Sequence, residues 1–180
     1  MIIAQKKRKE NIVEYILYMW HVEDLLRTCQ FNLIEIEKHL LLNYDQPESV
    51  RQEIRCWYKM LIDMAIYEGI EAKGHLQLIK NCVTALNDLH IQLIHMPQET
   101  VYSSLYYQAL PAIVELRTKA DNVQIPEIET CLTAVYGYFL LKLQAKEISM
   151  ETIESVKKIS SLLAYLAAKF HEGDVNNNLK

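Results

Sequence analysis

The stretch that decides the fold is NIVEYILYMWHVEDLLRTC, residues Asn11 to Cys29. Its apolar residues recur at alternating steps of three and four, which is the spacing of one helix face, at Ile12, Tyr15, Met19, Val22, Leu26 and Cys29. A second apolar row runs beside the first through Val13, Leu17 and Trp20. The helix is therefore apolar over most of its girth until Glu23 and Asp24, and such a helix needs burial on several sides. We predict that it is the central helix of an all-helical domain.

The composition favours long helices throughout the chain. The 180 residues include only four Gly and four Pro, whereas a β-rich fold of this length would need more turn residues. Periodic segments continue to the C-terminal end, and no linker divides them. We therefore predict an all-α fold, a single-domain bundle of about six to seven antiparallel helices over residues 1–173, followed by a polar tail over residues 174–180.

Capping residues mark several of the helix boundaries. Asn32 is a good N-cap for a helix from about Leu33 to Tyr44, and Ser149 is a good N-cap for the last helix, which we expect to end at Gly173. Pro111 lies inside the periodic segment 98–119 and should kink or split that helix. The basic run at residues 6–9 would oppose the macrodipole of a helix that began there, so either the first helix starts after it or the run answers to the acidic surface of a partner.

Charge and cysteine usage exclude several classes of protein. The net charge of −4 is unlike that of a general nucleic-acid binder, which needs a cationic surface, so we expect no nucleic-acid partner. No stretch approaches the roughly 20 uninterrupted apolar residues of a membrane span, so we expect no membrane partner. The four cysteines are widely spaced without a Cys-x-x-Cys pair, and we find no secretory leader. This pattern predicts four buried thiols and a protein of the reducing cytoplasm.

The middle of the chain lacks basic residues. Between Lys80 and Arg117 there is no Lys or Arg, although a soluble helix normally carries charge on its outer face. The stretch is instead rich in tyrosine, which is enriched at interfaces and at the mouths of pockets. The fourth and fifth predicted helices, over about residues 76–96 and 98–119, therefore either face another subunit or line a cleft. At an interface, the contacting residues would be Tyr102, Tyr106 and Tyr107. The alternative is that they are simply the most buried pair in the bundle.

Candidate chemical groups are sparse. The side chains of His90, His95, Tyr102 and Tyr106 can converge across the turn at Pro97, and we predict that any ligand-binding pocket lies there. The chain has no Glu-x-x-His pair, which di-iron helical proteins require, so we predict no metal site and no cofactor, and we assign no catalytic residue. Glu23 and Asp24 follow Trp20 and are expected at the rim of the helix, where they would hold Arg27.

The N-terminal run carries a resemblance to a known family. The segments Ala4-Gln5-Lys6, Glu10-Asn11-Ile12, Glu14-Tyr15, Tyr18-Met19-Trp20 and Glu23-Asp24-Leu25 resemble the opening of an uncharacterised domain-of-unknown-function family, and Gly74-His75-Leu76 and Leu110-Pro111 extend the match. The family consists of all-helical bacterial proteins of about this length, typical of gut anaerobes. The resemblance implies a bacterial, cytoplasmic origin and an all-helical fold, and it implies no activity, cofactor or site residue.

Two functions remain open from the sequence. The first is a non-enzymatic protein that acts by association, as a homo-oligomer or as an adaptor for another protein, through its uncharged middle. The second is a small-molecule-binding protein or enzyme with the His/Tyr-lined pocket between the fourth and fifth helices. We favour the first.

Overall fold

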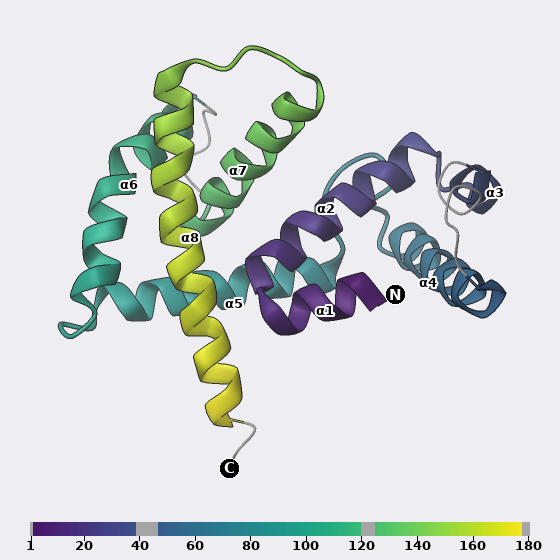
Figure 1. The fold of residues 1–180 in the computed structure, drawn as a ribbon, viewed down its shortest axis with the longest axis horizontal. Helices are drawn as coiled ribbons and strands as arrows, with labels where there is room; N and C mark the ends of the chain where they lie inside the picture. The colour runs from purple at the N-terminus through teal and green to yellow at the C-terminus, as the bar shows by residue number, and fades with distance from the viewer. Residues whose placement is uncertain (1, 39–46, 120–124, 178–180) are drawn as a thin grey trace. The chain divides into compact units, whose positions relative to one another are not determined.

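The computed structural model describes residues 2–38, 47–119 and 125–177. These residues form eight α-helices and no strand (Figure 1). The helices are α1 (Ile2–Glu10), α2 (Ile12–Thr28), α3 (Leu33–Ile36), α4 (Glu48–Tyr67), α5 (Gln77–Ile94), α6 (Thr100–Lys119), α7 (Glu127–Leu143) and α8 (Met150–Asn177). The predicted all-α fold is confirmed, with a helix count slightly above the predicted six to seven.

The chain divides into two compact units. The first comprises Met1–Lys9 and Glu14–Asn81, and the second comprises Glu10–Val13 and Cys82–Lys180. Helix α5 contributes to both, because the boundary falls within it. The single domain expected over residues 1–173 stays a prediction, and each unit is described here by itself.

Helix α2 has the burial that its apolar spacing predicts. All six residues of the first apolar row are buried, and Ile16 and Leu26 have no exposed surface. Val13 and Trp20 of the second row are buried as well. The helix is therefore buried on both of its apolar rows, as an apolar surface of this width requires.

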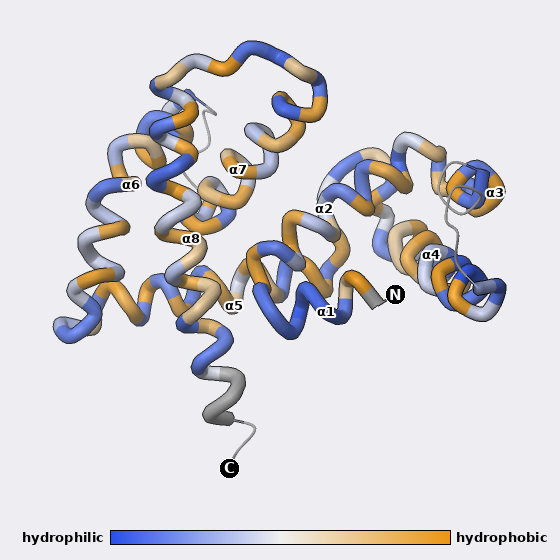
Figure 2. Tube along the Cα trace, in the orientation of Figure 1, coloured by the Kyte–Doolittle hydropathy of each residue, from blue (hydrophilic) through white to orange (hydrophobic). Residues whose placement is uncertain are grey.

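The basic run at residues 6–9 lies at the end of a helix rather than before one. Lys7, Arg8 and Lys9 occupy the last turn of α1, which appears in Figure 2 as a hydrophilic segment. Positive charge stabilises a helix C-terminus, so the placement agrees with the macrodipole. Helix α2 starts after this run, as the first of the two alternatives has it, but the separate helix α1 that contains the run was not predicted.

In the first unit, α3 packs against α4, and the core of α4 consists of Ile54, Tyr58, Leu61, Ile62 and Ala65. Asn32 caps α3 as predicted, because its side-chain oxygen accepts a hydrogen bond from the backbone N–H of Ile34 at 2.9 Å. Residues 39–46 of the helix expected to reach Tyr44 lie outside the described residues.

In the second unit, α6, α7 and α8 pack against one another (Figure 1). Their core is aliphatic, with side chains that have no exposed surface at Ile113, Ile128, Leu132, Ile159, Leu162 and Leu166. Burial of such side chains supplies about 1.5–3 kcal/mol each before the entropy cost of folding is subtracted. Ser149 caps α8 as predicted, because its hydroxyl accepts a hydrogen bond from the N–H of Thr152 at 3.2 Å.

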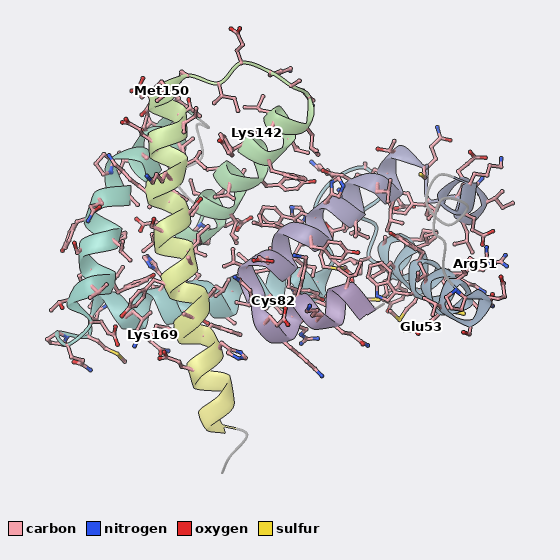
Figure 3. The ribbon with its side chains drawn as sticks, viewed as in Figure 1. Arg51, Glu53, Cys82, Lys142, Met150 and Lys169 are labelled. Carbon is pink, nitrogen blue, oxygen red and sulfur yellow. The ribbon has the colours of Figure 1, made fainter. Side chains whose placement is uncertain are left out.

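Two predicted helix breaks are absent. Helix α6 runs through Pro111 without interruption, and Pro111 is exposed, so the carbonyl that loses its N–H partner lies on the solvated side of the helix. Helix α8 starts at Met150, labelled in Figure 3, and continues past Gly173 to Asn177. A glycine weakens a helix by about 1 kcal/mol but does not end it when no proline or capping contact follows. The helix therefore extends into the predicted polar tail.

Candidate functional site

Three of the four residues predicted to form a pocket lie together in the second unit. His90 projects from α5, and Tyr102 and Tyr106 project from α6 one helical turn apart. The ring centroids of His90 and Tyr102 are 5.8 Å apart, and those of His90 and Tyr106 are 5.2 Å apart. Both tyrosine rings meet the imidazole edge to face, an arrangement that stabilises aromatic pairs.

Hydrogen bonds fix the tautomer of His90. Its Nε2 lies 3.4 Å from a carboxylate oxygen of Glu127, and its Nδ1 lies 2.6 Å from the hydroxyl oxygen of Tyr102. Because an ionised carboxylate only accepts, Nε2 carries the proton and Nδ1 accepts the hydroxyl proton of Tyr102. The other oxygen of Glu127 lies 3.4 Å from a guanidinium nitrogen of Arg117. A chain of polar contacts thus runs from Tyr102 through His90 and Glu127 to Arg117.

Burial shifts the pKa values in this cluster towards the neutral forms. Desolvation lowers the pKa of His90 below its ordinary 6.5, and the hydrogen bond and charge of Glu127 oppose this effect in part. Desolvation also raises the pKa of Tyr102, and it raises the pKa of Tyr106 to about 12 with help from Glu127. Burial raises the pKa of the neighbouring Cys131 thiol to about 12. The cluster is therefore neutral at His90, Tyr102, Tyr106 and Cys131 near pH 7, and its charge resides on Glu127 and Arg117.

The fourth predicted pocket residue lies elsewhere. His95 is exposed at the end of α5, and its Nδ1 lies 2.7 Å from the carbonyl oxygen of Ile91 one turn earlier. His90 itself is 3% exposed and Tyr102 has no exposed surface. The structure therefore brings together His90, Tyr102 and Tyr106 but not His95, and a ligand-binding role for these residues stays a prediction.

The three residues predicted for an interface differ in their exposure to solvent. Tyr102 is buried, Tyr106 is half-buried, and Tyr107 is 66% exposed. Tyr107 belongs to a row of exposed, uncharged residues that we call the α6 stripe: Val101, Ser104, Tyr107, Gln108, Pro111 and Val114. These positions are spaced by three or four residues, apart from the neighbouring pair Tyr107 and Gln108, so they lie on one face of the helix. The exposed face of α6 thus carries a row of uncharged residues, while Tyr102, Ala109, Ala112 and Ile113 of the same helix are buried.

A second polar cluster, in the first unit, does not follow the sequence prediction. Glu23 was expected at the rim of its helix together with Asp24, but Glu23 is only 2% exposed. One of its carboxylate oxygens accepts a hydrogen bond from the backbone N–H of Leu76 at 2.9 Å, and the other lies 2.5 Å from Nδ1 of His75. The ring of Trp20 stacks on His75 with centroids 4.5 Å apart. The Glu23 carboxylate therefore anchors the start of α5 to α2.

Asp24 and Arg27 complete this cluster. Asp24 holds Arg27 as expected, with 2.9 Å between oxygen and nitrogen. The guanidinium also donates to the carbonyl oxygens of Gly74 and Ile70. Gly74 has a φ of +95°, a conformation that other residues rarely adopt. The sequence holds one signal for this contact, because Glu23 is an acid at a position that continues the apolar rows of α2.

Within residues 2–38, 47–119 and 125–177, no group of three or more His, Cys, Asp or Glu side chains is arranged to hold a metal ion. His75, which the sequence places near Glu71, contacts Glu23 instead. None of the described helices combines the length and the apolar character that crossing a membrane requires.

The described part of the chain is thus an all-helical protein with two internal polar clusters and an uncharged exposed row on α6. The model of the family described as "Domain of unknown function (DUF4924)" matches residues 1–177, and the chain belongs to that family. The resemblance seen in the N-terminal run is confirmed by this match. No curated protein and no solved structure matches the chain.

Proposed function

We propose that this protein functions by protein-protein association, and that the partner is a second copy of the chain bound through the α6 stripe. The observation that carries the proposal is the exposure of uncharged residues on one face of a 20-residue helix. Val101, Tyr107 and Val114 are 56%, 66% and 53% exposed. A solvated helix face normally carries charges along its length, whereas on this face the charges of Glu115 and Lys119 follow the six uncharged residues at the C-terminal end and pair with each other at 2.5 Å.

The positions of the stripe suit a two-fold axis. Val101 and Val114, Ser104 and Pro111, and Tyr107 and Gln108 lie at equal distances on either side of a point between Tyr107 and Gln108. A second copy in the antiparallel direction would therefore set Val101 against Val114, and Tyr107 next to Gln108, twice each. Self-complementarity of this kind is what an isologous dimer requires. The spacing of the six residues of the α6 stripe meets this requirement.

The size of the contact sets the expected affinity. Helix α6 has 20 residues and is about 30 Å long. A single helix pair of this length buries less than the roughly 1,600 Å² of a standard stable interface. We therefore expect a dimer that dissociates in the micromolar range, unless neighbouring elements add to the contact.

Sedimentation velocity over a hundredfold range of concentration tests the proposal. The wild-type protein should shift from monomer to dimer as the concentration rises. Tyr107→Glu would place a charge at the centre of the stripe and should weaken the dimer at least tenfold, since a buried unpaired charge is costly. Tyr67→Glu is the matched control, because Tyr67 is 92% exposed on α4 and should leave the dimer unchanged.

Two results would contradict the proposal. One is a wild-type protein that stays monomeric at several hundred micromolar. The other is a dimer that withstands Tyr107→Glu, because the contact would then lie on another surface.

The location that suits this function is the cytoplasm. All four cysteines are free thiols, but the expected burial of all four was wrong, because Cys29 and Cys131 are buried whereas Cys82 is partly exposed and Cys56 is exposed. Disulfides form in oxidising compartments, so four free thiols support a reducing one. Fractionation of the host cells with an antibody to the protein would test the assignment, and recovery in a secreted or periplasmic fraction would contradict it.

A further inference from the structure

A cavity lies between α6, α7 and α8 in the second unit, and its α6 lining, from Ala112 to Lys119, follows Tyr102 and Tyr106 along the helix. Its volume is about 550 Å³, which falls within the range of sites for small ligands. Figure 3 labels Lys142 on α7 and Met150 on α8, which neighbour the lining residues Leu141 and Ser149. The walls are largely aliphatic, with contributions from Leu116, Ile125, Leu141, Val156 and Ile159.

Small residues on all three helices create this space. Ala112 faces the cavity from α6, Ala134 and Gly137 face it from α7, and Ser155 faces it from α8. Gly137 lies in the interior of α7 with ordinary helical backbone angles, so no turn requires a glycine there. A Cβ atom at Gly137 would meet no neighbouring atom within 4 Å, so no close helix contact requires it either. The glycine weakens α7 and leaves the cavity open.

The charges at the cavity cancel one another. Two basic and two acidic side chains line it among the described residues: Arg117, Lys119, Glu115 and Glu151. Lys119 and Glu115 form an ion pair of 2.5 Å at the exposed rim. Arg117 lies 3.4 Å from Glu127, which places a third carboxylate near the cavity. An anion would find no unpaired cation here, because Arg117 and Lys119 already contact Glu127 and Glu115, and a ligand of either charge would lose its hydration on entry.

The polar groups that remain are hydroxyls. Thr130 and Thr133 each donate to a backbone carbonyl of their own helix, at 3.2 and 2.8 Å, and can still accept a hydrogen bond. Tyr138 and Ser155 add two more hydroxyl groups to the lining. Aliphatic walls with a few hydroxyl groups fit an uncharged molecule that has an apolar body and one hydroxyl or carbonyl group.

From this geometry we infer that the cavity between α6, α7 and α8 is a binding site for an uncharged amphipathic small molecule, such as an alcohol or ester with an apolar chain. Gly137 keeps the site open, and Tyr138 supplies a hydrogen bond to the polar end of the ligand. This inference does not depend on the α6 stripe, since the cavity lies within one copy of the chain.

The test is isothermal titration calorimetry with three probes that share one apolar body: 1-octanol, octanoate and octylamine. Octanol should bind with one site per chain, and the two charged probes should bind at least tenfold more weakly. Gly137→Leu fills the cavity and should abolish octanol binding, while Gly137→Ala should retain it. Tyr138→Phe removes one hydrogen bond and should weaken octanol about three- to tenfold.

Each result decides for or against the inference. Saturable octanol binding that is lost in Gly137→Leu supports it. If Gly137→Leu does not fold, Ser155→Leu fills the same cavity from α8 and should have the same effect. Absence of octanol binding up to its solubility limit would overturn the inference, as would octanol binding that withstands the filling variants. Equal binding of octanoate or octylamine would overturn the assignment of an uncharged ligand.

Discussion

Replacement of Glu23 by Ala should destabilise the first unit by about 3 kcal/mol. The carboxylate is 2% exposed, and its removal leaves the N–H of Leu76, whose residue has no exposed surface, without its acceptor. A buried donor left unsatisfied costs about 1–3 kcal/mol, and the loss of the contact with His75 adds a hydrogen bond to a charged group worth about 1.5–3 kcal/mol. Partial entry of water into the site would offset some of this sum.

Two further variants calibrate the result. Glu23→Gln keeps a carbonyl oxygen that accepts from the N–H of Leu76. Its amide N–H can donate to Nδ1 of His75 when His75 carries its proton on Nε2. The free energy of unfolding should therefore fall by only about 1 kcal/mol. Asp24→Ala is the matched control, because Asp24 is the neighbouring acid, its side chain is 44% exposed, and Arg27 keeps the carbonyl oxygens of Gly74 and Ile70 as acceptors when Asp24 is removed. Its loss should cost about 1 kcal/mol or less.

Urea unfolding followed by tryptophan fluorescence suits this experiment. Both tryptophans, Trp20 and Trp57, belong to the first unit, and Trp20 stacks on His75. The signal therefore reports on the part of the chain that the Glu23 variants perturb. A free energy of unfolding for Glu23→Ala within about 0.5 kcal/mol of the wild type would refute the reasoning, because removal of a buried carboxylate with two hydrogen-bond partners should cost more than this.

Three further predictions concern other elements. Because burial lowers the pKa of His90 below 6.5, the unfolded chain binds this proton first as the pH falls. The stability that neutral His90 contributes should be present above pH 6.5 and lost below it, with a slope of at most about 1.4 kcal/mol per pH unit. In urea unfolding followed by circular dichroism, His90→Gln should flatten the dependence of the unfolding free energy on pH between pH 5 and about 6.5. Gly137→Ala should raise the free energy of unfolding by about 0.5–1 kcal/mol in the same assay, since its Cβ would meet no neighbouring atom within 4 Å, and a loss of stability would show that the space is occupied. Asn32→Ala removes the cap of α3 and should cost about 1 kcal/mol, whereas Asn32→Asp should retain it; equal losses in the two variants would argue against the cap.

Local signals in the sequence were the most reliable. The three-four spacing from Ile12 to Cys29 predicts the buried rows of α2, and the caps at Asn32 and Ser149 predict the starts of α3 and α8. These features depend on residues within one or two helical turns of each other, so the sequence is sufficient to find them. The run without Lys or Arg between Lys80 and Arg117 likewise marks the segment that carries the α6 stripe.

Contacts between distant residues could not be predicted from the sequence. Glu23 meets His75, which lies 52 residues later in the chain, and the pairing of Glu127 with His90 spans 37 residues. Periodicity assigns a residue to a face of its own helix but does not say which helix packs against that face. The cavity lined by Ala112, Gly137 and Ser155 is invisible for the same reason, because three separate helices have to be placed before their small residues face one another.

Site-specific disulfide formation tests most directly the central claim, which is that two copies associate through the α6 stripe around an axis between Tyr107 and Gln108. In a Cys56→Ser background, which removes the exposed native thiol, Gln108→Cys should form a covalent dimer under mild oxidation. Val101→Cys alone should not, because the two copies of residue 101 would lie about 20 Å apart along antiparallel helices. An equimolar mixture of Val101→Cys and Val114→Cys should cross-link efficiently. Cross-linking of Val101→Cys with itself as fast as Gln108→Cys, or no cross-linking in any of these samples, would contradict the claim.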